Sequence, residues 1–411
     1  MSSRLGKTIR DLGLENYEEA EQPQEGTNGN FVPVDLTPAT DIVETHEMLA
    51  GANAQHEETQ AITADMRTVS DAQAAFEAYA ALLEKAGDEG IDETAAAFMR
   101  VGMEHFEKIL GLNTPVTPAL ENWAGPSSNR RSTQVSLESI KDRAKGLGKM
   151  LKDLLKKLMQ GLMHFLQNLV AGIGRLEERA TRAEEKAKAI KGRPAKPSFE
   201  LKNPAKLFAD GVFKGQDVTA IAGVAEFMAI HYPREVKAYA DGAAAIIKSA
   251  KEGEDISVRL GELKKPGSDA FAKPEILPGN QIITVLENTD GGTSGLTFKE
   301  APDAKPAPDS CEVKVRDLSK ISQHIDAILT TCNRLRECRK VESIFKPSME
   351  ALANALEGRD DLGRWMREML TEFAGSSFSQ FQGVVIYCAW TLNAQLAVCE
   401  QELALYQQPS A

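Results

Sequence analysis

The feature that most constrains this chain is an apolar stripe with helical spacing that runs from Leu137 to Ile190. Its members recur at steps of three and four residues, the period that keeps one face of an α-helix apolar. If the helix is continuous, it is roughly 80 Å long at about 1.5 Å per residue. Ser136 is expected to be its N-cap, and Glu138 follows in the first turn, where a negative charge complements the helix dipole. The stripe consists of Leu137, Ile140, Ala144, Leu147, Leu151, Leu154, Leu158, Leu162, Phe165, Leu169, Ile173, Leu176, Ala180, Ala183, Ala187 and Ile190.

The opposite face of this predicted helix is basic in its first half. Between residues 138 and 157 there are 7 Lys or Arg residues and 3 acidic residues, a balance of 7 − 3 = +4. Such a face is either simply solvated or contacts phosphate groups of nucleic acid through counterion release, without sequence specificity. Its lysines, here called the lysine face, are Lys141, Lys145, Lys149, Lys152, Lys156 and Lys157.

The centre of the same helix, residues 158–174, contains no Lys, Arg, Asp or Glu, which raises the question of a membrane span. Its 17 residues include Gln160, His164, Gln167 and Asn168. A helical span needs about 20 predominantly apolar residues, so this stretch is too short and too polar. It fits a buried helix of a bundle, which we prefer, or an amphipathic helix on an anionic membrane.

The remainder of the chain predicts a mainly α protein. Aromatic residues make up only 6% of an Ala-, Lys- and Glu-rich sequence, a composition that favours helices packed on helices. β-branched runs at 281–286 and 295–299 indicate a small hairpin, to which 311–315 adds a third strand. We therefore expect helical bundles with one long amphipathic helix and a small β-hairpin or three-stranded insertion near 275–316. The predicted regions are a flexible acidic arm (1–40), an acidic helical region (41–121), a linker (122–135), the long helix (136–191), a helical region (200–272), a small β region (273–316) and a C-terminal helical region (317–411).

Charge is distributed unevenly along the chain. Residues 1–125 hold 7 basic and 23 acidic residues, a balance of 7 − 23 = −16, whereas the whole chain carries −12. The remaining residues therefore carry +4. An acidic first part joined to a mildly basic body indicates that the two have different partners, or that the first masks the second until some event.

The sequence contains no recognisable catalytic, cofactor or metal motif, and we expect no enzymatic activity. The six histidines are scattered without a metal-binding spacing, and the Lys145–Lys149 run KGLGK lacks the spacer and ending of a phosphate loop. Cys332 and Cys388 fall at apolar helical positions, so the five cysteines are expected to be buried, reduced thiols. The first residues lack the apolar core of a secretory signal, which predicts synthesis in the cytoplasm.

Residues 133–192 resemble the signature portion of the internal head proteins of giant tailed bacteriophages. In that portion a Ser-x-Glu step (Ser136 to Glu138) opens a long Lys- and Leu-rich amphipathic helix. The helix ends in a charged Leu-Glu-Glu-Arg-Ala stretch, here residues 176–180. This chain carries leucines where such helices often have Trp or Phe.

The resemblance implies a structural protein of the virion that is made in the host cytoplasm and packaged with DNA inside the capsid. Its partners would be other head proteins and a prohead protease that cuts after Glu in a small-x-Glu motif. Two such motifs flank the linker and end at Glu121 and Glu138. Cutting after Glu121 would remove the −16 part, making region 41–121 a candidate propeptide, and would leave a body of net +4.

Two alternatives from other classes remain open on the sequence alone. One is a membrane-active protein, either a toxin or an ejected virion protein, whose 137–173 helix inserts at an anionic bilayer. The other is a self-assembling scaffold of a cell. The helical stripes at 137–190 and 378–403 would be satisfied by self-association or by pairing within one chain.

Overall fold

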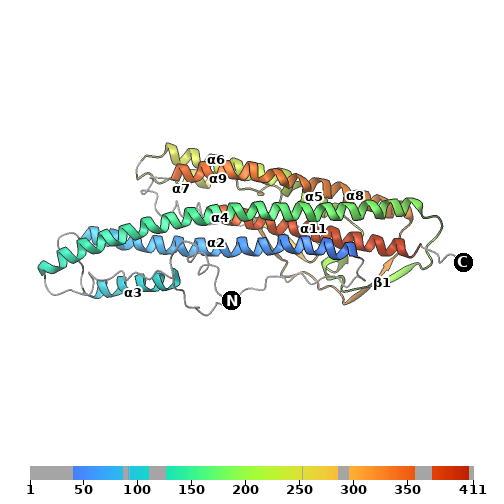
Figure 1. The fold of residues 1–411 in the computed structure, drawn as a ribbon, viewed down its shortest axis with the longest axis horizontal. Helices are drawn as coiled ribbons and strands as arrows, with labels where there is room; N and C mark the ends of the chain where they lie inside the picture. The colour runs from blue at the N-terminus through green and yellow to red at the C-terminus, as the bar shows by residue number, and fades with distance from the viewer. Residues whose placement is uncertain are drawn as a thin grey trace. The chain divides into compact units, whose positions relative to one another are not determined.

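The computed structural model describes residues 40–86, 91, 93–110, 126–251, 253–285, 296–356 and 373–406. Within these residues the fold is mainly α, as predicted, and the strands form short two-stranded pairs (Figure 1). The described residues divide into two compact units. The first is built mainly from Glu58–Gln160, and the second from residues 40–57, Gly161–Ala355 and 376–406.

The apolar stripe lies on one continuous helix, α4, which spans the 64 residues Pro126–Ala189. This corresponds to about 96 Å of helix. Because α4 begins at Pro126, the predicted N-cap at Ser136 is wrong, and residues 126–135 are helical although we predicted a linker over 122–135. The physical reason is that proline, with its fixed φ and missing N–H, suits the first helical position, and no helix breaker follows it.

The predicted stripe is confirmed as the buried face of α4. Every member from Ile140 to Ala187 is buried, whereas Leu137 and Ile190 at the two ends are half-buried. The uncharged stretch 158–174 follows the same pattern, since its stripe residues are fully covered by other parts of the chain. The spacing of three and four residues in the sequence therefore identified the face of α4 that packs against the rest of the protein.

In the first unit, α4 packs with two acidic helices. α2 spans Thr40–Ala86, and its part from Glu58 onward belongs here, together with α3, Glu93–Leu110. The rings of Phe76 and Phe106 meet edge-on with centroids 6.3 Å apart. A Cβ at Gly102 would overlap the hydroxyl of Tyr79, so the close approach of α3 to α2 requires glycine there.

In the second unit, the first part of α2 and the last part of α4 pack with α11, Gly375–Ala404. Phe165 of α4 meets Phe381 of α11 edge-on at 6.4 Å between centroids, and His46 of α2 meets Trp390 at 4.2 Å. The predicted stripe on α11 is buried in the same chain, so pairing within the chain accounts for it. Its buried members are Phe378, Phe381, Val385, Cys388, Leu392, Leu396, Cys399 and Leu403.

Helix α11 is also the one helix in the described part of the chain that is long and apolar enough to cross a membrane. Its most apolar window has a mean hydropathy of 1.2, and every residue of that window is buried inside the protein. Core helices that are covered on all sides have the same composition.

Among the described residues of the region 200–272, three helices occupy part of the chain, which also contains short strands. α5, Thr219–Glu226, continues through a π-helical segment, Phe227–His231, into α6, Tyr232–Ser249. Pro233 in the first turn of α6 has no N–H to donate to the preceding turn, and the wider π turn accommodates it. A short helix, α7, follows at Ser257–Gly261.

The predicted hairpin is confirmed, and the third strand pairs elsewhere. β4, Gln281–Val285, and β5, Leu296–Glu300, are antiparallel with Ile283 opposite Phe298. β6, Ser310–Lys314, lies instead beside β1, Ser198–Lys202, a strand that was not predicted from the sequence. The reason is a small apolar core in which Leu201 of β1 and Val313 of β6 pack against Val398. A further antiparallel pair consists of two short strands of two residues each, β2 (Phe208–Ala209) and β3 (Val212–Phe213).

The remaining helices follow β6. α8 spans Leu318–Arg336 and is capped by Asp317, whose carboxylate accepts the backbone N–H of Lys320 at 2.9 Å. A short 3₁₀ turn, Glu337–Lys340, leads to α9, Val341–Leu356. All five cysteines are free thiols. Those at positions 332, 338, 388 and 399 are buried, as predicted, whereas Cys311 is only half-buried.

Candidate functional site

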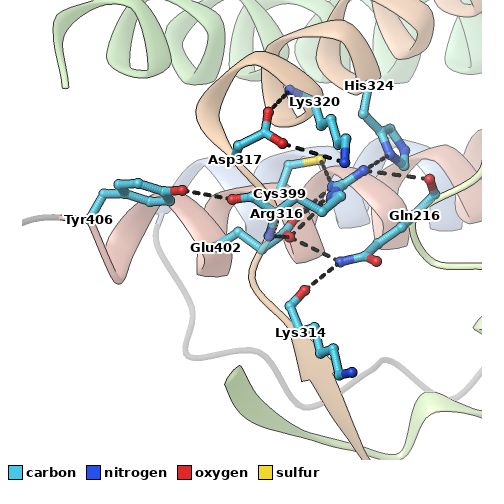
Figure 2. Close-up of polar contacts among 9 residues, drawn as sticks. All are labelled: Gln216, Lys314, Arg316, Asp317, Lys320, His324, Cys399, Glu402 and Tyr406. Atoms are coloured by element: carbon cyan, nitrogen blue, oxygen red, sulfur yellow. Dashed lines mark hydrogen bonds and ion pairs between the residues drawn. The ribbon is translucent and has the colours of Figure 1, made fainter. Parts of the chain in front are cut away.

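A polar cluster of the second unit surrounds Glu402, near the end of α11 (Figure 2). Its side chain is 0% exposed, which is unusual for a carboxylate and requires compensation by hydrogen bonds and an opposite charge. We call this group the Glu402 cluster. It consists of Gln216, Arg316, His324, Cys399, Glu402 and Tyr406.

The Glu402 carboxylate is saturated by donors. Arg316 Nε donates to both carboxylate oxygens at 3.1 Å, and Arg316 Nη2 forms an ion pair with Oε2. The backbone N–H of Arg316 donates to Oε1 at 3.0 Å, and Gln216 Nε2 donates to the same oxygen at 2.9 Å. Charge-assisted bonds of this kind are what allow a carboxylate to remain ionised inside a protein.

The guanidinium of Arg316 has no nitrogen left for a ligand. Besides its bonds to Glu402, Nη1 donates to Nδ1 of His324 at 2.6 Å, and Nη2 donates to Sγ of Cys399 at 3.4 Å. The hydroxyl of Tyr406 donates to the Arg316 carbonyl at 2.7 Å. The cluster therefore fastens the end of α11 to the junction between β6 and α8 and to the loop before α5.

The pKa values of His324 and Cys399 in this cluster do not suit acid–base or nucleophilic chemistry. Burial, with the neighbouring Arg316 charge second, lowers the pKa of His324 to about 4, so the ring is neutral at pH 7. Burial raises the pKa of the Cys399 thiol to about 12, so it is not a thiolate. A general base needs a pKa near the working pH, and neither group provides one. These groups have a structural role, because their hydrogen bonds connect α11 with the residues before α8.

Sequence reasoning missed the Glu402 cluster, although one signal was available. Glu402 stands between Cys399 and Leu403 on the apolar stripe of α11, and a single carboxylate there indicates a buried ion pair. The partner was not identifiable, because Arg316 lies 86 residues away in sequence.

An open cleft of about 620 Å³ adjoins the cluster and extends along α5 and α8, from Lys320 in the first turn of α8 to Arg334 in its last turn. Its lining includes Asp217, Thr219, Lys320, His324 and Arg334. No group of three or more His, Cys, Asp or Glu side chains that could hold a metal ion occurs in the part of the chain that the structure describes.

The lysine face predicted from sequence lies on α4 in the first unit, opposite the buried stripe. Five of its lysines are exposed and Lys157 is half-buried. Lys156 pairs with Asp153 of the same helix at 3.0 Å, and Lys141 pairs with Glu84 of α2. Next to the face, Arg143 forms an ion pair with Glu107 of α3, with side chains only 18% and 10% exposed. The acidic helices therefore already neutralise the beginning of the basic helix.

The two candidate cleavage residues differ in their surroundings. Glu138 is exposed, but it lies inside α4, where its backbone is helical. Glu121 lies outside the described residues. Glu138 is not part of the Glu402 cluster or of the cleft lining described next to it.

Comparison with known families identifies the chain. A family model described as phiKZ-like phage internal head proteins matches residues 39–401, well over half of the sequence. The chain belongs to this family. No curated protein and no solved structure matches it.

As an internal head protein, the chain is a structural component of the virion, made in the host and located inside the capsid, where it associates with other head components. The resemblance found in residues 133–192 is thus confirmed, and it extends over both units. A phage family leaves no ground for the cellular scaffold alternative. Within the described residues, the apolar stripe needed for membrane insertion is buried, so membrane activity would require the helices to separate.

Proposed function

We propose that this internal head protein is cut by the prohead protease at Glu121 and contacts packaged DNA through the lysine face. The observation that carries the DNA contact is the position of that face. Five lysines are exposed along one side of α4, while the opposite side of the helix is buried. Lysines in such a row contact phosphate groups without reading the base sequence.

Glu121 is favoured over Glu138 as the cleavage residue for a conformational reason. Proteases bind several substrate residues in an extended form, which a helix interior provides only after local unwinding. Glu138 lies twelve residues inside α4. Glu121 stands in a segment with Pro, Asn, Ser and Gly between helices, where the sequence predicts a loop.

Cutting alone is not expected to release the acidic helices. α2 buries Leu49, Met66, Phe76 and Leu83 almost completely against the rest of the chain. Each such side chain contributes about 1.5–3 kcal/mol when buried. We therefore expect residues 1–121 to stay bound after the cut, and the lysine face does not depend on their removal because it is exposed in the uncut chain.

Co-expression with the prohead protease, followed by mass spectrometry, tests the cut. Intact-mass measurement under denaturing conditions should give two fragments, the larger beginning at Asn122, that co-elute in native size exclusion. Glu121→Gln should remain uncut, and Glu138→Gln should be cut normally as the matched control. An uncut wild-type chain in mature particles would exclude processing, and cutting before Ser139 would move the site to Glu138.

The lysine face is tested by the salt dependence of DNA binding. Replacing Lys145, Lys149, Lys152 and Lys156 with Gln removes four phosphate contacts, so the slope of log K against log salt should become shallower by about 3 to 4. A control with the same charge change replaces four exposed lysines of the second unit, Lys237, Lys248, Lys251 and Lys264, with Gln. Equal slopes for the two variants would refute a specific role of the face.

A further inference from the structure

Helix α3 of the first unit is apolar on its outward side as well as on its buried side. The rest of the protein covers the buried side at Ala96, Met99, Met103 and Leu110. On the outward side, the side chain of Phe98 is 74% exposed and that of Val101 is 61% exposed. The outward side of a helix that packs on a core is normally polar, so an exposed apolar patch there indicates a surface for a further contact.

Phe98 and Val101 lie one helical turn apart on the same face of α3. Among the large apolar side chains exposed in the part of the chain that the structure describes, no other two lie one turn apart on one helix. The neighbours of this pair on the same face are also exposed. We call the whole set the α3 face, and it consists of Thr94, Ala97, Phe98, Val101 and His105. Its steps of three and four residues are those with which one helix packs along another.

The charges beside the α3 face are complementary to those of a second copy in the antiparallel direction. Arg100 and Glu104 stand on one flank of the face, with side chains 43% and 58% exposed, and they pair with each other at 3.7 Å. A two-fold axis through Val101 brings the same flank of both copies together. Arg100 of one copy then lies two residues, about 3 Å along the helix, from the level of Glu104 of the other. Two ion pairs therefore form across the interface.

A parallel arrangement of two α3 helices lacks this complementarity. In that arrangement, the flank with Arg100 and Glu104 meets the opposite flank of the second copy. Gly102 of the opposite flank lies against Tyr79 of α2, where even a Cβ atom would overlap the tyrosine hydroxyl. The opposite flank also has no charged residue, since it consists of Ala95, Gly102 and Ile109.

We propose that the α3 face is a self-association surface, on which a second copy of this chain binds through its own α3 in the antiparallel direction. Val101 meets its own copy on the two-fold axis. Phe98 lies one residue, about 1.5 Å along the helix, from the level of His105 of the other copy, so the two rings come into contact. The proposal does not depend on the cut at Glu121 or on DNA binding.

The size of the α3 face sets the strength of the expected dimer. With 18 residues, α3 is about 27 Å long. One face of such a helix is smaller than the roughly 800 Å² that each partner buries in a stable interface, so the dissociation constant is expected to be on the order of 100 µM. Such a dimer forms where many copies are packed together, as they are inside a capsid.

Sedimentation equilibrium of the full chain, from about 5 to about 500 µM, tests the proposal. We expect a monomer at the lowest concentration and a substantial share of dimer at the highest. Val101→Lys places two ammonium groups against each other on the two-fold axis and should weaken dimerisation by about tenfold or more. The matched control is Val258→Lys, at a valine of α7 that is 70% exposed, and it should dimerise like the wild type.

Charge reversal tests the antiparallel direction. Arg100→Glu alone places like charges across the interface and should weaken dimerisation, and the double variant Arg100→Glu, Glu104→Arg should restore it. Lys237→Glu is the matched control, because Lys237 also pairs with an acidic residue four positions later, at side-chain exposures of 51% and 45%. This control should dimerise like the wild type.

Three outcomes contradict the proposal. A chain that stays monomeric at every concentration overturns it and leaves the α3 face to a different head protein. A wild-type dimer that Val101→Lys leaves intact also overturns it, because association then uses another surface. If the double variant does not recover the dimer lost in Arg100→Glu, the antiparallel direction is wrong. Circular dichroism of each variant verifies that the fold is intact.

Discussion

Arg316→Ala is expected to lower the free energy of unfolding by about 3–5 kcal/mol, because it leaves the carboxylate of Glu402 buried without an opposite charge. The side chains of this pair are 13% and 0% exposed, so water cannot replace the guanidinium. The loss includes the bonds to His324 and Cys399. Urea unfolding followed by circular dichroism measures it as a lower midpoint at unchanged slope.

Two further variants show whether burial of the charge causes this loss. Arg334→Ala removes an arginine from an ion pair with side chains 39% and 41% exposed and should cost less than about 1 kcal/mol. The double variant Arg316→Met, Glu402→Leu removes both charges and should recover part of the stability lost in Arg316→Ala. If Arg316→Ala proves no more harmful than Arg334→Ala, Glu402 is not held as a buried anion.

The helical part of this fold was predictable because its signals are local. The stripe on α4 and the stripe on α11 are periodic over many turns, and each period fixes which face is buried whatever covers it. The stop between α2 and α3 was likewise visible, since glycines at 87 and 90 interrupt an Ala-rich pattern. The start of α4 was misplaced because polar residues after Pro126 suit a helix start and a linker equally well.

What the sequence did not predict depends on contacts between distant residues. β1 is a five-residue segment whose only strand partner, among the described residues, is β6, more than a hundred residues later. The same holds for Gln216, Arg316 and Glu402, which three separate segments bring together. The lysine face was predictable from the spacing of its residues. The ion pair between Lys141 and Glu84 was not, because it depends on how α2 packs on α4.

The buried histidine of the cluster should make the protein sensitive to acid. Burial and the Arg316 charge lower the pKa of His324 to about 4, against the smaller opposing effect of Asp217, while the unfolded chain keeps the ordinary value of 6.5. Between these two values the unfolded state binds more protons than the folded state. The contribution of His324 to stability is therefore fully present above pH 6.5 and is lost as the pH falls toward 4, by up to about 3 kcal/mol.

His324→Asn separates this effect from the titration of the many carboxylates. The amide oxygen of Asn can accept from Arg316 Nη1, and the side chain does not titrate in this range. The free energy of unfolding, measured by urea denaturation at pH 7.5, 5.5 and 4.5, should fall more steeply for the wild type than for the variant, and the two curves should converge as the pH falls. Parallel curves would mean that His324 binds its proton equally well in the folded and unfolded chain, and the ring would then not be held neutral by its burial beside Arg316.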